Sequence, residues 1–249
     1  MAQGGIPEEF EVGEPVLVCR WRLAKRTLPA ANRHMRALGS RIVNGAPLSK
    51  QLLGWAKQHI EWTLAEGTVE HPNGVLMLLV DAEGRAAMAA GDYEPLADDS
   101  LAGLVARARE SVREAGELGV APETLWAARD GALVCAAPEG QPFSGVSTLV
   151  EDLAAAYGLP VAHDAGLLCE LEASAHAMPS REAARRGDDL AGSAGRGDAG
   201  SAELAAGEAT PDVFLASDEH GIVPARGAAG PEARRFADAY ARLLEKAGR

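Results

Sequence analysis

The residues best placed to bind a small anion lie in a turn of small side chains, Ser144 to Thr148, which opens a predicted helix. Apolar side chains recur at helical spacing after this turn, and Gly158 is placed to end the helix. A Gly/Ser turn at a helix N-terminus points free backbone N–H groups outward, which suits an anion such as a phosphate. The alternative is a capped helix without a ligand, for which Thr148 and Glu151 have capping-box spacing.

A second candidate for anion binding is the segment 20–41, the only cationic stretch in an acidic chain. Two interpretations stay open, a solvated helix face or a pocket that receives the carboxylate or phosphate of a substrate. The basic residues of the segment are Arg20, Arg22, Lys25, Arg26, Arg33, Arg36 and Arg41.

The first 95 residues contain the elements expected to position the basic segment. An apolar run predicts a strand over 16–19, and amphipathic spacing predicts a helix over 48–66. The continuous apolar run at 75–80 predicts a buried strand, and a weaker strand is expected at 86–90. Asp92 to Pro95 breaks this pattern, so we expect a small N-terminal α+β domain over 1–95 and a larger C-terminal domain over 96–249.

The second part of the chain alternates helices and short strands. A helix is predicted over 101–118, and the Asp130-Gly131 pair between two apolar runs predicts a hairpin with a type I′ turn. A strand is expected at 159–162 and a helix at 167–177. The segment 174–210 lacks aromatic residues, Val and Ile, which predicts a flexible insertion rich in Gly, Ala and Ser. Strands are expected at 212–216 and 221–224, before a helix that begins with Gly230 and Pro231.

Composition limits the classes of function. The net charge of −12 argues against nucleic acid and gives no support for an anionic membrane surface. No apolar run approaches the length of a membrane span, and the polar, acidic N-terminus has no apolar region typical of a signal peptide, so a cytoplasmic protein is expected. The three cysteines are odd in number and far apart, and the histidines lack ligand spacing, so neither a disulfide framework nor a metal site is expected.

Three segments in the C-terminal half together resemble the class IV aminotransferase family, the fold-type IV pyridoxal-phosphate enzymes that include aminodeoxychorismate lyase. The resemblance implies an α/β (α+β) fold of two domains, pyridoxal phosphate as cofactor, a small amino-acid-like substrate and a homodimer. The matching segments are ARDGALVCAAPEGQPFSGVSTLVEDLAAAYGLPV (128–161), PDVFLASDEHGIVPA (211–225) and GPEARRFADAYARLL (230–244).

The same resemblance implies which residues bind the phosphate of the cofactor. The first contact comes from the backbone N–H groups of Gly145, Val146 and Ser147, and the second from the turn that contains Ser217 and Asp218. Here the sequence departs from the family, because Asp218 and Glu219 place two carboxylates beside a dianion. One like-charge pair at ~5 Å costs roughly 3 kcal/mol at an effective dielectric constant of 20. Either these side chains point away or phosphate binding is weakened or lost.

The resemblance also implies a lysine that forms a Schiff base with the cofactor. The candidates are Lys25, Lys50 and Lys57, because Lys246 ends the terminal helix. If the helix at 101–118 opens the large domain, Asp98-Asp99-Ser100 stands where the lysine is expected.

In a second alignment, the helix at 48–66 and the hairpin at 75–90 open the large domain. Lys50 or Lys57 could then serve as the lysine, but the family's glutamate that partners the pyridine nitrogen would fall near Met88. We prefer the first alignment because it leaves less of the chain unexplained.

Two functions of different classes follow from these observations. The first is a class IV aminotransferase, or a lyase of the same family, that acts on a small amino-acid-like substrate. The second is a degenerate relative that has lost the cofactor and acts as a binding or assembly partner. A third interpretation is an unrelated acidic α/β protein in which each matching segment is an ordinary cap or hairpin.

Overall fold

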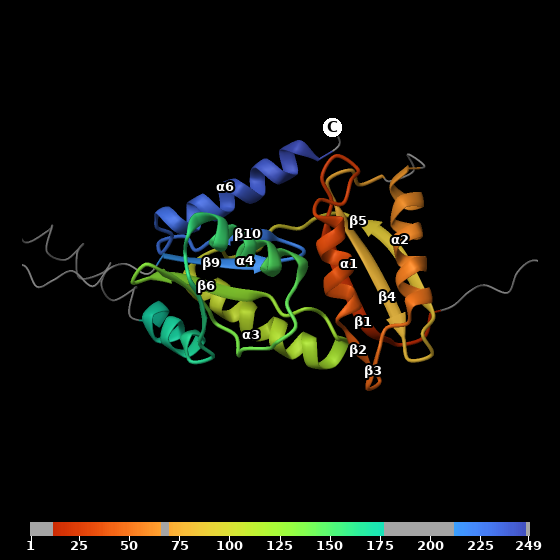
Figure 1. The fold of residues 1–249 in the computed structure, drawn as a ribbon, viewed down its shortest axis with the longest axis horizontal. Coiled ribbons are helices and arrows are strands. Elements are labelled where there is room, and N and C mark those ends of the chain that lie inside the picture. The colour runs from red at the N-terminus through yellow and green to blue at the C-terminus, as the bar shows by residue number, and fades with distance from the viewer. Residues whose placement is uncertain (1–11, 66–69, 177–211, 248–249) are drawn as a thin grey trace, which may run out of the picture.

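A computed structural model describes residues 12–65, 70–176 and 212–247 of the 249-residue chain. Two sheets lie side by side, one built from residues 15–91 and the other from residues 124–224 (Figure 1). The mixed α/β architecture expected from the sequence is confirmed. The segment around residue 95, predicted as the domain boundary, lies between the last strand of the first sheet and the first helix of the second part.

The first sheet is antiparallel, with strand order β1-β4-β5. Its strands are β1 (Pro15–Arg22), β4 (Val75–Asp81) and β5 (Ala86–Gly91). The apolar run of β4 is buried because this strand is the central one and pairs on both sides. Helices α1 (Ala31–Gly39) and α2 (Lys50–Ala65) contribute to its core, and a short hairpin of β2 (Ile42–Val43) and β3 (Ala46–Pro47) connects them.

The second sheet has five strands in the order β10-β9-β6-β7-β8. All its neighbours are antiparallel except β7 and β8. The strands are β6 (Thr124–Arg129), β7 (Ala132–Cys135), β8 (Val161–His163), β9 (Asp212–Ser217) and β10 (Gly221–Pro224). The helices around them are α3 (Leu101–Leu118), α4 (Gly145–Tyr157), α6 (Pro231–Lys246) and a helix at 167–176.

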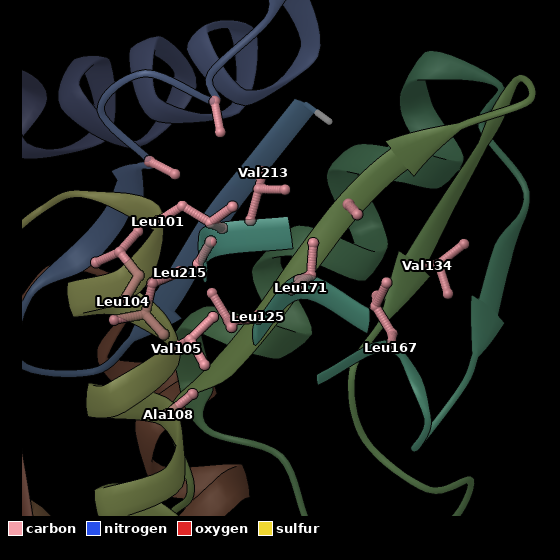
Figure 2. Close-up of a cluster of buried hydrophobic side chains, with 14 residues drawn as sticks. Leu101, Leu104, Val105, Ala108, Leu125, Val134, Leu167, Leu171, Val213 and Leu215 are labelled. Carbon is pink, nitrogen blue, oxygen red and sulfur yellow. The ribbon is translucent and has the colours of Figure 1, made fainter. Parts of the chain in front are cut away.

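Helices cover both faces of this second sheet, and the alternation of side chains along the strands supplies a core to each face. Leu125 and Leu215 belong to the core formed with α3 and the helix at 167–176 (Figure 2). Trp126 and Phe214, one position away on the same two strands, belong to the core formed with α4 and α6. Helix α4 therefore has one side on the sheet, and it also contacts α1 of the first part.

The local turns follow the sequence with one correction. Asp130 and Gly131 have φ values of 53° and 74°, which confirms the hairpin with both central residues in the left-handed region. The prediction of a capping box formed by Thr148 and Glu151 is wrong, because α4 begins before Thr148, at Gly145. Its N-cap is Ser144, whose hydroxyl accepts a hydrogen bond from the backbone N–H of Ser147. The Thr148 hydroxyl instead donates to the Gly145 carbonyl oxygen inside the first turn.

Two other expectations are changed by the structure. The start predicted for the flexible insertion at 174–210 is too early, because residues 174–176 are still helical and Ala175 is buried. The rest of the predicted insertion lies outside the described residues. The alignment in which α2, β4 and β5 open the large domain is wrong. These strands pair with β1, whereas α3 packs on β6 and β9 of the second sheet.

In the described ranges no helix is both long and apolar enough to cross a membrane.

Candidate functional site

A small, partly open cavity of about 20 Å³ lies where the two parts of the chain meet. Five segments supply its walls: β1, α1, Arg41 after α1, the loop after α3, and the end of β9 with the turn that follows it. The lining side chains that carry polar or charged groups are Cys19, Arg20, Trp21, His34, Arg41, Glu123, Ser217, Asp218 and Glu219.

The carboxylate of Asp218 occupies the N-terminus of α4. Its Oδ1 accepts a hydrogen bond of 2.8 Å from the backbone N–H of Val146, and the N–H of Gly145 also points at this carboxylate. The Asp218 carbonyl oxygen accepts a bond of 2.9 Å from the backbone N–H of Arg22 on β1. The turn after β9 is therefore held on one side by α4 and on the other by β1, with the Asp218 side chain 13% exposed.

His34 of α1 completes the surroundings of this carboxylate. Its Nδ1 lies 3.3 Å from Asp218 Oδ1, and the imidazole is 3% exposed. Burial raises the pKa of Asp218, but the neighbouring His34 and the backbone N–H groups of Val146 and Gly145 together outweigh burial and lower it. Asp218 is therefore an ionised side chain at neutral pH, and the positive end of α4 adds to its stabilisation.

Arg41 brings a further positive charge to the cavity. It is 8% exposed, and its guanidinium makes no hydrogen bond or ion pair within the part of the chain that the structure describes. Burial lowers the pKa of Arg41, and the nearby Cys19 and Asp218 oppose this shift. Burial also raises the pKa of the Cys19 thiol to about 12, so this cysteine is protonated and is not a nucleophile at neutral pH.

An ionic network fills the space next to the cavity. Arg107 of α3 contacts Glu114 and Glu123, each at 2.9 Å, and Arg20 of β1 lies 3.6 Å from Glu114 and 3.9 Å from Glu219. Glu123 is 7% exposed and its Oε2 has no hydrogen-bond partner among the described residues. Burial raises the pKa of Glu123, and the bond from Arg107 only partly offsets this effect. The network links β1, α3 and the turn after β9 by charge pairs.

The three lysines proposed as Schiff-base residues lie away from the cavity. Lys25 is exposed, and its Nζ donates to the Glu245 carbonyl oxygen at 2.5 Å. Lys50 and Lys57 are exposed on α2, and Lys246 is exposed near the end of α6. All four lysines of the chain are described, and none of them lines the cavity.

The five residues expected to bind a cofactor phosphate are brought together, but their polar groups are already paired. Gly145 and Val146 face the Asp218 carboxylate. The Ser147 hydroxyl lies 2.9 Å from both the Ser144 and the Thr124 hydroxyl oxygens. The Ser217 hydroxyl accepts bonds from the backbone N–H groups of two residues in its own turn, Glu219 and His220.

The basic segment 20–41 separates into several environments rather than forming one helix face. Arg20 and Arg22 lie on β1, and Arg41 enters the cavity. Arg33 of α1 donates to the Thr148 carbonyl oxygen at 3.2 Å and pairs with Asp152 at 2.6 Å, which fastens α1 to α4. Reasoning from the sequence missed Glu123 and Arg107, because no local pattern marks a pair that only packing brings together.

Comparisons with known proteins identify the fold. A protein assigned as a branched-chain amino acid aminotransferase of Thermotoga maritima aligns over 94% of this chain and 87% of its own, with a TM-score of 0.50 and 12% identity. A hypothetical aminotransferase of Mycobacterium tuberculosis, solved with pyridoxal phosphate bound, aligns over 98% and 95% with a TM-score of 0.48 and 12% identity. The Escherichia coli branched-chain amino acid aminotransferase aligns over 96% and 92% with a TM-score of 0.47 and 13% identity.

No protein-family model matches the sequence, and no curated protein matches it. The likeness to the Thermotoga maritima protein shows the fold alone at this identity. The chain therefore has the fold of the class IV aminotransferases.

Pyridoxal phosphate, which this fold implies, does not fit the residues of the cavity. The volume of about 20 Å³ holds a single water molecule, whereas sites for small molecules span roughly 300–1,000 Å³. The backbone N–H of Val146, which could donate to a phosphate, already donates to Asp218 Oδ1, and no lysine lines the cavity. The described residues also contain no cluster of ligands for a metal ion.

Proposed function

We propose that this chain is a non-catalytic protein with the class IV aminotransferase fold, which does not hold pyridoxal phosphate and acts as a binding or assembly partner. One observation carries the proposal: no lysine lines the cavity between the two parts of the chain. A Schiff base requires a primary amine beside the carbonyl carbon of the cofactor. Lys25, Lys50 and Lys57 are exposed side chains. Arg41, whose guanidinium has no partner among the described residues, is not a nucleophile.

The charges around the cavity support the same proposal. Arg20, Arg107, Glu114 and Glu123 pair with one another across the meeting point of β1 and α3, where a substrate would need free groups. Such a network ties the two parts of the chain together, since breaking it leaves buried charge without a partner. A junction held by charge pairs suits a protein that presents a constant surface to a partner.

The aminotransferase or lyase alternative, acting on a small amino-acid-like substrate, rests on the fold alone and stays a prediction. Both functions are tested by incubating the purified protein with pyridoxal phosphate, reducing with borohydride and mapping the labelled lysines by mass spectrometry. We expect no visible absorption band from a lysine-bound cofactor and only scattered, partial labelling of the exposed lysines. The urea-unfolded protein serves as the control for labelling of accessible amines.

Stoichiometric labelling of one lysine in the folded protein, accompanied by a visible band, would overturn the proposal. Lys25→Ala, Lys50→Ala and Lys57→Ala variants then identify which residue holds the cofactor. Loss of the band in only one of them would assign the catalytic lysine.

We propose a second copy of the chain as the partner. The expectation of a homodimer comes from the family resemblance, and sedimentation equilibrium tests it directly. We expect a mass twice the 25.9 kDa of one chain at micromolar concentration. A single-chain mass over the same concentration range would contradict the dimer. Absence of nucleic-acid and membrane binding also remains an expectation, which rests on the net charge of −12.

A further inference from the structure

We infer that the outer side of helix α2 is the surface through which two copies of this chain associate, as an antiparallel pair of α2 helices. The inference deepens the proposed function and rests on it, because it names the surface that binds the second copy. This surface, which we call the α2 seam, consists of five side chains of which none is buried: Gln51, Trp55, Gln58, Trp62 and Ala65.

The α2 seam has the spacing at which two α-helices pack against each other. Its residues recur at alternating intervals of four and three, so they form one line along the helix. The two buried residues of α2, Ala56 and Ile60, lie on the opposite side and face the core of the first sheet. Figure 1 shows α2 at the edge of the molecule, on the side away from the second sheet. The helix therefore has one side for the core and a second line of residues that faces outward.

Aromatic rings form the middle of the α2 seam. Trp62 is 51% exposed, although it is among the largest side chains of the chain. The His59 imidazole stacks on Trp55 with 4.0 Å between ring centroids and lies 5.3 Å from the ring of Trp62. Tryptophan is enriched at the centres of protein interfaces, and a ring already held by its neighbours loses little conformational freedom on binding. The rings are therefore suited to contact another protein.

The absence of charge distinguishes the α2 seam from the outer sides of the other long helices. Exposed positions of α3 include Arg113 and Glu117, and those of α6 include Asp238 and Arg242. The seam contains aromatic, amide and small residues only. Charged residues are depleted at the centre of interfaces, most of all between identical chains. Two copies that each carry a net charge of −12 repel each other, so a contact without negative charge favours their association.

Charges beside the seam determine the relative direction of the two helices. Lys50, Lys57 and Glu61 are exposed and lie along one flank of the seam. A parallel pair would bring each lysine to the same lysine of the second copy. An antiparallel pair centred near Lys57 interleaves the tryptophans of the two copies and places Glu61 of one copy at the level of Lys50 of the other. Charge complementarity therefore favours the antiparallel pair.

The length of α2 limits the strength of this association. Its 16 residues span about 24 Å, so a single pair of helices buries less than the ~1,600 Å² of a standard protein interface. We therefore expect a dissociation constant of about 1–100 μM for the dimer. The contact belongs to the class of weak interfaces that form and separate with changes in concentration.

The first test is sedimentation equilibrium of wild type, Trp62→Glu and Val112→Glu over about 1–300 μM, with circular dichroism to confirm folding. Val112 on α3 is the matched control, because it is 55% exposed, close to the 51% of Trp62. We expect Trp62→Glu to raise the dissociation constant of the dimer about tenfold or more, since it places a charge at the centre of the contact. Val112→Glu is expected to change it less than about twofold.

The second test uses Lys50→Glu and Glu61→Lys to measure the direction of the helices. Each variant alone brings like charges together in an antiparallel dimer, so each should dimerise about threefold or more weakly than wild type. In an equimolar mixture the two variants complement each other at both ends of the contact. We expect the mixed dimer to be as tight as that of the wild type, measured by fluorescence energy transfer between separately labelled variants.

A dimer that Trp62→Glu leaves as tight as wild type would overturn the inference and leave the homodimer in place through another surface. An equal effect of Val112→Glu would overturn it as well. A mixture of Lys50→Glu and Glu61→Lys without preference for the mixed dimer would overturn the antiparallel arrangement. A monomeric wild type at the highest concentration would overturn both the inference and the homodimer. Labelling of one lysine by pyridoxal phosphate would instead refute the loss of the cofactor, and the sedimentation result would remain readable.

Discussion

His34 Nδ1 and Asp218 Oδ1 lie 3.3 Å apart and join α1 of the first part of the chain to the turn after β9 of the second. The Asp218 carboxylate also accepts a hydrogen bond from the backbone N–H of Val146. This one carboxylate therefore links α1, α4 and the turn after β9. Replacing it by asparagine keeps the shape but removes the charge, and hydrogen bonds to charged groups contribute about 1.5–3 kcal/mol. We expect Asp218→Asn to lower the free energy of unfolding by about 2 kcal/mol at pH 7, measured in urea.

The pH dependence of this difference follows from the lowered pKa of Asp218. Burial alone would raise it, but His34 and the backbone N–H groups make the folded-state pKa lower than the unfolded one. Such a carboxylate stabilises the fold above its unfolded pKa of ~3.9, and the contribution is lost as pH falls through the folded pKa. The gap between wild type and Asp218→Asn should be constant near pH 5 and shrink below pH ~4. A gap that widens on acidification would contradict this assignment.

Arg107 provides the only basic partner that the described residues offer to the buried Glu123. Removing one member of a buried pair costs roughly 3–5 kcal/mol, because the other charge is left without compensation. We expect Arg107→Met to reduce the unfolding free energy by about this amount. The matched control is Arg113→Met on the same helix, because Arg113 is 57% exposed and pairs with Glu110 and Glu117 at the surface. Its expected effect is under ~1 kcal/mol, and equal effects of the two changes would contradict the role of burial.

Glu123 should give a pH dependence opposite in sign to that of Asp218. Burial raises its pKa in the folded protein, so the charged form is less favourable there than in the unfolded chain. A carboxyl of this kind lowers stability as pH rises from the unfolded pKa through the folded one. The stability of Glu123→Gln relative to wild type should therefore increase between pH 4 and pH 8, as followed by thermal unfolding. A difference that does not change with pH would show that Arg107 fully compensates burial.

Gly145 stands where α4 approaches α1 too closely for a side chain. A Cβ at this position would lie 2.5 Å from His34 Nδ1 and 3.0 Å from the His34 backbone nitrogen. Gly145→Ala should therefore cost about 1–3 kcal/mol, as overpacked sites do. A Cβ added at Gly54, within α2, would have no atom within 4 Å. Gly54→Ala should therefore stabilise the protein by up to ~1 kcal/mol. Urea unfolding of both variants checks the opposite signs, and stabilisation by Gly145→Ala would refute the close contact.

Local features of the fold could be read from the sequence because short-range physics decides them. The Asp130-Gly131 hairpin, the buried run of β4 and the Gly230-Pro231 start of α6 all occur as expected. Each depends on backbone preferences or apolar patterning within a few residues. The order of the C-terminal segments was also enough to indicate the fold that the structural comparison shows.

The contacts that define the candidate site were decided only by tertiary structure. From the sequence, Asp218 could point away from the α4 N-terminus or towards it, and the structure places its carboxylate 2.8 Å from the Val146 nitrogen. Likewise, only the tertiary structure showed that α2, which carries Lys50 and Lys57, packs in the core of the first sheet. These outcomes join residues far apart in the chain, so they depend on how helices and sheets pack and not on any local pattern.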